Sequence, residues 1–140
     1  MPRLHALEPR FVDYVPDKLT EGVLYVSMTY ATAAHLCCCG CGEEVVTTLS
    51  PTDWQLAFDG RTVSLKPSIG NWSLRCQSHY WIRRNRVEWS AQMSADQIAA
   101  GRATDRIRKE QFYHEDGKSP NASVARRPRW LAWLMRIGRR

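Results

Sequence analysis

Cys37-Cys38-Cys39-Gly40-Cys41-Gly42 is the stretch that decides how this chain folds, and Cys76-Gln77-Ser78-His79 is its counterpart further along. A structural zinc site takes four tetrahedral Cys or His ligands, usually contributed by two separate turns. A long segment separates the two groups here, as expected for turns that one metal ion joins. The sequence therefore predicts a structural zinc ion that staples a small fold at this point.

More ligands are present than such a site needs, because five cysteines and a histidine compete for four positions. Cys38 and Cys41 have the Cys-x-x-Cys-Gly spacing of a metal-binding turn, in which the glycine lets backbone amides face the sulfurs. Alternatively, the alternating Cys37, Cys39 and Cys41 bind together and leave Cys38 over. The second turn adds a Cys-x-x-His spacing. The residues by themselves leave these pairings open.

Length and composition fit one domain with a real core, since the chain has 140 residues, of which 44% are hydrophobic. No apolar run reaches the roughly 20 residues of a membrane span. The start, Met1-Pro2-Arg3-Leu4-His5, lacks the pattern of a secretory signal. We therefore expect a cytoplasmic protein, in which thiols stay reduced and clustered cysteines bind metal before they form disulfides.

The net charge of +6 is unevenly distributed, with −2 over residues 1–82 and +8 over residues 83–140. Such asymmetry is typical of proteins that bind nucleic acid, a membrane surface or an acidic protein. Basic and aromatic residues alternate near the end of the chain, which suits nucleic acid. Because no recognised nucleic-acid module accompanies them, nucleic acid ranks lowest among the partners considered.

The segment from Gly22 to Trp89 is predicted to form short strands and tight turns. Strands are expected at residues 23–26, 43–49, 54–58, 62–65, 79–82 and 87–89. Asp59-Gly60 between two alternating runs is a strong hairpin signal, and Arg83-Arg84-Asn85-Arg86 is expected to close a second hairpin. These patterns predict a mainly β (α+β) fold, with a small antiparallel core followed by one or two C-terminal helices.

The pattern changes after Trp89. Ser94 followed by Gln97 resembles a capping box and predicts a helix from about Ala95 to Tyr113, with a thin apolar stripe typical of a surface helix. The last segment places Trp and Leu at helical spacing among six Arg, which predicts a basic amphipathic helix. The predicted organisation is a zinc-bearing β domain at 1–92, a helix at 93–116, a linker at 117–125 and a basic amphipathic tail at 126–140.

A second motif, Leu65-Lys66-Pro67-Ser68-Ile69-Gly70-Asn71-Trp72, is predicted to be a turn. Pro67 fixes its entry, Gly70 permits a positive φ, and Asn71 offers an amide that both donates and accepts. By itself, Ser68 in this setting is most simply a turn hydroxyl that bonds its own backbone.

Three motifs in order, Cys37–Gly42, Pro67–Trp72 and Cys76-x-Ser78-His79-Tyr80-Trp81-Ile82, resemble a bacterial family long labelled only as a domain of unknown function. Its members are often encoded beside ubiquitin-like proteins and their activating and conjugating enzymes. The similarity spans about Tyr25 to Trp89. It implies a small zinc-bearing β domain that acts as a peptidase on the ubiquitin-like protein, with that protein and its conjugation enzymes as partners.

The resemblance also implies which residues bind the metal. In the family's pattern, the ligands are at the positions of Cys37, Cys39, Cys41 and Cys76. Cys38 is variable there, and His79 is freed for another role. Four thiolates leave zinc no open place for a catalytic water, so the chemistry needs an activated nucleophile instead.

The nucleophile is predicted to be Ser68, with His79 as its base. Asn71, or the Gly70-Asn71 backbone amides, is expected to stabilise the oxyanion. Ser78 is the competing nucleophile, although adjacent residues on a strand point to opposite faces, which disfavours a Ser78–His79 pair.

Other residues compete for supporting roles. His35 is the competing base. Asp53 and Asp59 read as turn residues, either of which is also a candidate to orient the base.

The leading hypothesis is thus a zinc-stabilised serine peptidase that processes or deconjugates a bacterial ubiquitin-like protein. Its cleft is expected to be narrow, with walls formed by Trp72, Tyr80 and Trp81. The alternative is a non-catalytic zinc-binding adaptor in a ubiquitin-like conjugation pathway. The substrate and the oligomeric state are left open.

Overall fold

The computed structural model describes residues 2–115 of the chain. This part contains eight strands and one helix. The strands are β1 (Glu8–Phe11), β2 (Val23–Ser27), β3 (Thr32–Leu36), β4 (Glu44–Thr48), β5 (Gln55–Phe58), β6 (Val63–Gly70), β7 (His79–Arg83) and β8 (Arg86–Trp89). The helix α1 spans Ala95–Glu115. Among the described residues, no helix is long and apolar enough to cross a membrane.

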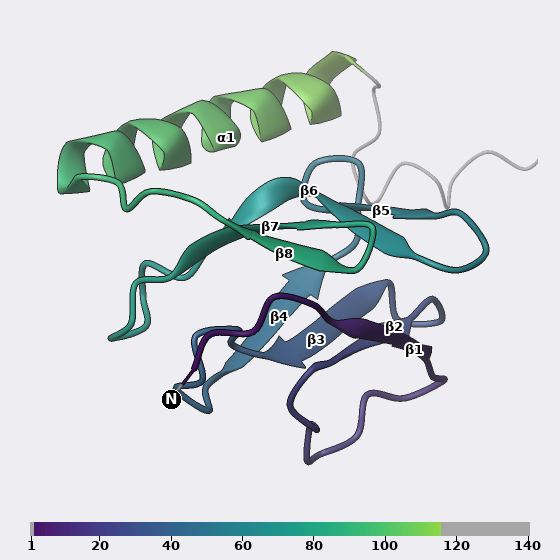
Figure 1. Ribbon diagram of the computed structural model, residues 1–140. Helices are drawn as coiled ribbons and strands as arrows, with labels where there is room; N and C mark the ends of the chain where they lie inside the picture. The colour runs from purple at the N-terminus through teal and green to yellow at the C-terminus, as the bar shows by residue number, and fades with distance from the viewer. Residues whose placement is uncertain (1, 116–140) are drawn as a thin grey trace, which may run out of the picture. The chain divides into compact units, whose positions relative to one another are not determined.

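The strands form two four-stranded sheets, in the orders β1-β2-β3-β4 and β5-β6-β7-β8. Neighbouring strands are antiparallel, except that β1 and β2 are parallel. Figure 1 shows the two sheets stacked as layers, with β1–β4 in one and β5–β8 in the other. The predicted mainly β fold is therefore confirmed, although the sequence patterns did not indicate β1 and β3.

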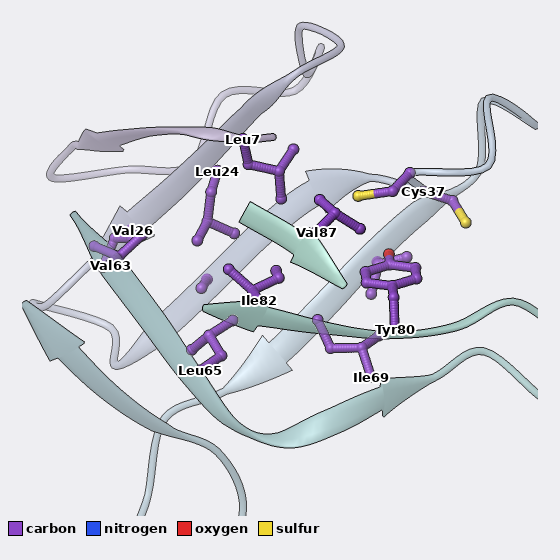
Figure 2. Close-up of a cluster of buried hydrophobic side chains, with 13 residues drawn as sticks. Leu7, Leu24, Val26, Cys37, Val63, Leu65, Ile69, Tyr80, Ile82 and Val87 are labelled. Atoms are coloured by element: carbon purple, nitrogen blue, oxygen red, sulfur yellow. The ribbon is translucent and has the colours of Figure 1, made fainter. Parts of the chain in front are cut away.

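One core lies between the two sheets. The first sheet contributes Leu24, Val26, Ala33 and Val45, and the second contributes Val63, Leu65, Ile69, Tyr80, Ile82 and Val87. Figure 2 shows these side chains converging, with Cys37 and Tyr80 at the same end of the cluster. Residues alternate between faces of a strand, so the partly buried His79 and Trp81 lie on the outer face of β7, opposite buried Tyr80 and Ile82.

The segment predicted as a turn around Pro67 is instead the second half of β6. The register of β6 against β7 shifts between Leu65 and Ile69, an irregularity that lets a strand contain a proline. The positive φ predicted for Gly70 was wrong, because this glycine is not among those with a left-handed backbone. Gly70 is needed for space instead, since a Cβ there would collide with the indole of Trp72.

The predicted capping box at the start of α1 is confirmed. The Gln97 backbone N–H donates to Ser94 Oγ over 3.2 Å, and the Ser94 N–H donates to Gln97 Oε1 over 2.9 Å. The strands belong to one compact unit that ends at Ala99, and the rest of α1 belongs to a second unit. The predicted linker at 117–125 and the basic tail at 126–140 lie outside the described residues.

Candidate functional site

Four cysteine sulfurs gather where the end of β3 meets the segment leading into β7. The Sγ atoms of Cys37, Cys39, Cys41 and Cys76 all lie within 4.8 Å of one another. Three of their separations are 3.5 Å (Cys37–Cys39), 3.8 Å (Cys37–Cys76) and 3.9 Å (Cys41–Cys76). Four thiolates at about 2.3 Å from a tetrahedral zinc ion are about 3.8 Å apart. The cluster thus fits one tetrahedral metal ion with no open coordination position.

The local backbone explains why three alternating cysteines reach one point. Gly40 and Gly42 have φ values of 88° and 81°, a conformation that glycine adopts without a steric penalty. The Gly40 N–H donates to the Cys37 carbonyl over 3.1 Å, which closes a tight turn. Of the ligand sets that the sequence left open, the structure brings together the alternating three cysteines and Cys76.

Cys38 and His35, which also competed for roles, both lie in the core. Cys38 is fully buried, and burial raises the pKa of its thiol to about 12. His35 is fully buried as well, with Nε2 at 2.6 Å from the hydroxyl of Tyr80. Burial lowers the pKa of His35 to about 4, so its imidazole is neutral at neutral pH. Neither residue presents a reactive group to solvent.

A polar network holds the cysteine cluster from the side of β7. Ser78 Oγ lies 3.0 Å from Cys37 Sγ and 3.4 Å from Cys76 Sγ. The Asn71 side-chain amide donates to Ser78 Oγ over 2.9 Å, and the Asn71 backbone N–H donates to the Ser78 carbonyl over 2.8 Å. Although burial opposes it, hydrogen bonding from Ser78 lowers the pKa of Cys76 to about 7. The network therefore favours the thiolate that a metal requires.

Ser68 and His79 form a hydrogen-bonded pair on the outer face of the second sheet. Ser68 Oγ lies 2.8 Å from His79 Nε2, and His79 Nδ1 lies 2.9 Å from the carbonyl oxygen of Ala91. A carbonyl only accepts, so Nδ1 carries the proton and Nε2 of the neutral ring accepts from the Ser68 hydroxyl. This is the arrangement that activates a serine as a nucleophile.

Trp72 and Gly70 frame this pair. Gly70 is directly opposite His79 in the β6–β7 register. The Trp72 ring lies edge-on to the His79 imidazole, with ring centroids 5.0 Å apart, and also covers the position where a Gly70 side chain would stand. Because the neighbouring Asn71 N–H donates to the Ser78 carbonyl just before β7, the Gly70 N–H points the opposite way, away from β7.

The positions of three other candidate residues show whether each can belong to the site. The prediction that Tyr80 walls a cleft was wrong, because its side chain is completely buried among core residues. Asp59 is a turn residue, since its carboxylate accepts from Arg61 and Thr62 in the β5–β6 turn. Asp53 accepts from the Ser50 hydroxyl over 2.7 Å.

The orienting group for His79 was missed by sequence reasoning. It is the main-chain carbonyl of Ala91, in the segment after β8. A backbone carbonyl leaves no mark on the residue type at its position, so no pattern in the sequence signals it. From the sequence, the segment between β8 and α1 was expected only to lead into the helix.

Fold and site together define a small two-sheet protein with a partly exposed serine–histidine pair and a cluster of four cysteines that could hold a metal ion. The chain belongs to the bacterial ubiquitination-like system serine protease family, BubE, whose family model matches residues 11–90. This range contains the cysteine cluster and the serine–histidine pair, and it confirms the resemblance seen in the sequence. No curated protein and no solved structure matches the chain.

Proposed function

We propose that this protein is a zinc-stabilised serine peptidase that processes or deconjugates a bacterial ubiquitin-like protein. The observation that carries the proposal is the Ser68–His79 hydrogen bond of 2.8 Å, with the imidazole held in the accepting tautomer by Ala91. Membership of a serine protease family in a bacterial ubiquitination-like system supports the reaction class and the pathway.

In the proposed reaction, Ser68 Oγ attacks the scissile carbonyl while its proton passes to His79 Nε2. The resulting imidazolium is stabilised by the hydrogen bond from Nδ1 to the Ala91 carbonyl. His79 then gives the proton to the leaving amine, and the acyl group remains on Ser68. Water, deprotonated by the same nitrogen, hydrolyses the ester and returns Ser68 to its hydroxyl form.

The oxyanion needs donors near Ser68, and the backbone N–H of Gly70 is the proposed one. It is two residues from the nucleophile on the same strand, and it is directed away from β7. The side-chain amide of Asn71, expected from the sequence for this role, donates to Ser78 in the buried network. Its participation as an oxyanion donor would require it to leave that partner.

Zinc is the metal proposed for the cysteine cluster, because four soft thiolates in a tetrahedral arrangement select it over hard cations. A saturated site supplies no catalytic water, so its proposed role is to hold the two turns together. Cysteines that bind a metal and form no disulfides are typical of the proposed cytoplasmic setting.

The direct test is to mix the protein with a ubiquitin-like precursor encoded beside it and to follow cleavage by mass spectrometry. We expect Ser68→Ala to abolish cleavage and to abolish labelling by a fluorophosphonate probe, which reacts only with activated serines. Ser73→Ala is the matched control, because Ser73 is exposed in the turn after β6. Cleavage that persists in Ser68→Ala would refute the nucleophile.

One observation favours the adaptor alternative. Phe11 and Phe58 pack edge to face with centroids 4.9 Å apart, yet both remain about half exposed, at 45% and 50%. Exposed aromatic pairs are typical of protein-binding surfaces. An adaptor would bind conjugation enzymes through this pair and would not react with the fluorophosphonate probe, so the same labelling experiment separates the two functions.

A further inference from the structure

A basic hollow lies on the second sheet, at the hairpin end of β7 and β8. It has a volume of about 410 Å³ and is lined at its charged positions by Lys66, Arg83, Arg84, Arg86 and Glu88. His79, Trp81 and Arg83 follow one another at every second position of β7, so the hollow shares the outer face of the sheet with the Ser68–His79 pair. At about 3.3 Å per residue, Arg83 lies about 13 Å along the strand from His79.

Most of the positive charge in this hollow is uncompensated. Among the described residues that line it, Glu88 is the only one with a carboxylate, and it pairs with Arg83 over 2.7 Å. The Arg83 guanidinium also lies over the Trp81 ring, 4.4 Å from its centroid, and is thereby held in place. Within residues 2–115, no carboxylate forms an ion pair with Lys66, Arg84 or Arg86, and all three are exposed.

Asp59 also lies close enough for its charge to interact with Arg84. The Asp59 carboxylate already accepts three hydrogen bonds inside the β5–β6 turn. Two come from the backbone N–H groups of Arg61 and Thr62, and the third comes from the Thr62 hydroxyl. Those bonds hold the carboxylate in the turn. The hollow therefore keeps cations that are available to an acidic ligand.

We propose that the basic hollow binds an acidic segment of the same polypeptide that Ser68 cleaves. The inference rests on the proposed peptidase function, and it deepens that function by naming the chemistry of a second contact. An extended chain whose scissile bond lies at Ser68 brings a residue about four positions away over the hollow. Carboxylates there would pair with Lys66, Arg84 and Arg86, and forked guanidinium groups suit them.

A nucleic acid is a poorer occupant on the same observations. Nucleic-acid binding of useful strength rests on many phosphate contacts, about 6–10 in strongly salt-dependent complexes, whereas this hollow offers three unpaired cations. Trp81, the aromatic residue beside it, is already covered by Arg83 on one ring face. Continuity with the Ser68–His79 pair on one sheet face favours a peptide instead.

Binding can be measured without catalysis by using the full chain with Ser68→Ala. The probes are fluorescein-labelled peptides with four Glu or four Gln followed by Gly-Gly, with fluorescence anisotropy as the readout. We expect the Glu peptide to bind about tenfold more tightly at 50 mM salt, with most of the difference lost at 300 mM because exposed charges are screened. Equal affinities for the two peptides at low salt would overturn the proposal.

Charge reversal locates the binding surface. Arg86→Glu and, independently, Lys66→Glu should each weaken binding of the Glu peptide about threefold to tenfold and leave the Gln peptide unaffected. Lys18→Glu is the matched control, because it makes the same charge change at an exposed position before β2, outside the lining of the hollow. Equal losses in Lys18→Glu would show a general charge effect and contradict a specific site.

A short oligothymidylate provides the competing outcome, since tighter binding of this probe than of the Glu peptide, lost in Arg86→Glu, would replace the peptide with nucleic acid. Fluorophosphonate labelling of the wild-type chain is measured separately. An unlabelled chain that still prefers the Glu peptide would refute the nucleophile but leave the hollow as an acidic-peptide site. A labelled chain with no preference would refute the hollow alone.

Discussion

The two sides of β7 differ in burial and in the partners of their side chains. On the inner side, Tyr80 bonds to His35, and just before the strand Ser78 bonds to Asn71 and the cysteine sulfurs. On the outer side, His79 offers one nitrogen to a serine hydroxyl and is only partly buried. Adjacent residues of the chain therefore belong to a buried polar network on one side and to a partly exposed serine–histidine pair on the other. Under the proposed function, the cysteines hold the strand from one side and the chemistry takes place on its other face.

Removing the metal should have the largest effect, because it removes the clamp on the inner side. We expect chelation, or Cys37→Ser, to abolish cooperative unfolding. Metal binding in small zinc domains contributes about 10–16 kcal/mol, which is comparable to or larger than the whole stability of a domain. The measurement is a thermal melt paired with elemental analysis, which should give one zinc per chain before chelation.

Cys38→Ala is the matched control for that experiment. Cys38 is buried beside the cluster but is not one of the four clustered cysteines. It should keep its metal and lose only about 1 kcal/mol of stability from the small cavity. If the chelated wild-type protein melts at the same temperature as the untreated protein, the clamp does not exist.

Replacing His79 tests whether the outer side reacts independently of the inner one. His79→Ala should lower the rate of fluorophosphonate labelling about 10²–10⁴-fold, because the general base is lost. The zinc content of the variant should be unchanged, since the two ring nitrogens of His79 bond to Ala91 and Ser68 and not to the cysteines. His114→Ala, at an exposed position of α1, is the control. Loss of zinc in His79→Ala would show that metal binding by the cysteine cluster depends on the Ser68–His79 pair, and would contradict their independence.

Ser78→Ala sharpens the comparison from the inner side. Its hydroxyl lies 3.0 Å from Cys37 Sγ, so its removal should weaken metal binding about 10–100-fold. Competition with a coloured chelator measures this affinity. At saturating metal, labelling of Ser68 should return to near the wild-type rate. A variant that stays slow with its metal fully bound would instead place Ser78 in the reaction.

The smallest effect is expected at Gly70. In Gly70→Ala the added methyl group pushes the Trp72 indole away from His79, which should slow labelling about tenfold while leaving the metal bound. Gly101→Ala is the control, because a Cβ there meets nothing and removing a helical glycine stabilises by about 1 kcal/mol. Equal labelling rates in Gly70→Ala and the wild type would mean that Trp72 does not position the imidazole.

Much of the fold was predictable where hydrophobic and polar residues alternate. The β5–β6 hairpin around Asp59 and the β7–β8 hairpin both formed at the expected positions. β3 was missed because its centre, Ala33 to His35, is buried without alternation and lacks β-branched residues. β1 was missed because it is short, contains Pro9 and pairs in parallel with β2, without the tight turn that marks an antiparallel hairpin.

The part of the site that could be predicted from the sequence is the part that residue types alone reveal. Four cysteines within five residues already indicate a metal, and the structure adds which of them converge. The short distance between Ser68 and His79 could not be predicted in this way, because it depends on how β6 shifts its register against β7. Strand pairing is a non-local property, and the pattern of Pro67 and Gly70 suggested a turn instead of a strand.

Ala91 has a consequence for how such a site appears in mutational data. The group that orients His79 is a main-chain carbonyl, and every amino acid has one. A saturation scan would therefore record position 91 as tolerant, even though its oxygen sets the tautomer of His79, the proposed base. Only a change that moves the backbone, such as a deletion between β8 and α1, would expose the contribution. Such a scan would identify Ser68 and His79 by their side chains and would miss Ala91, the third member of the hydrogen-bonded arrangement.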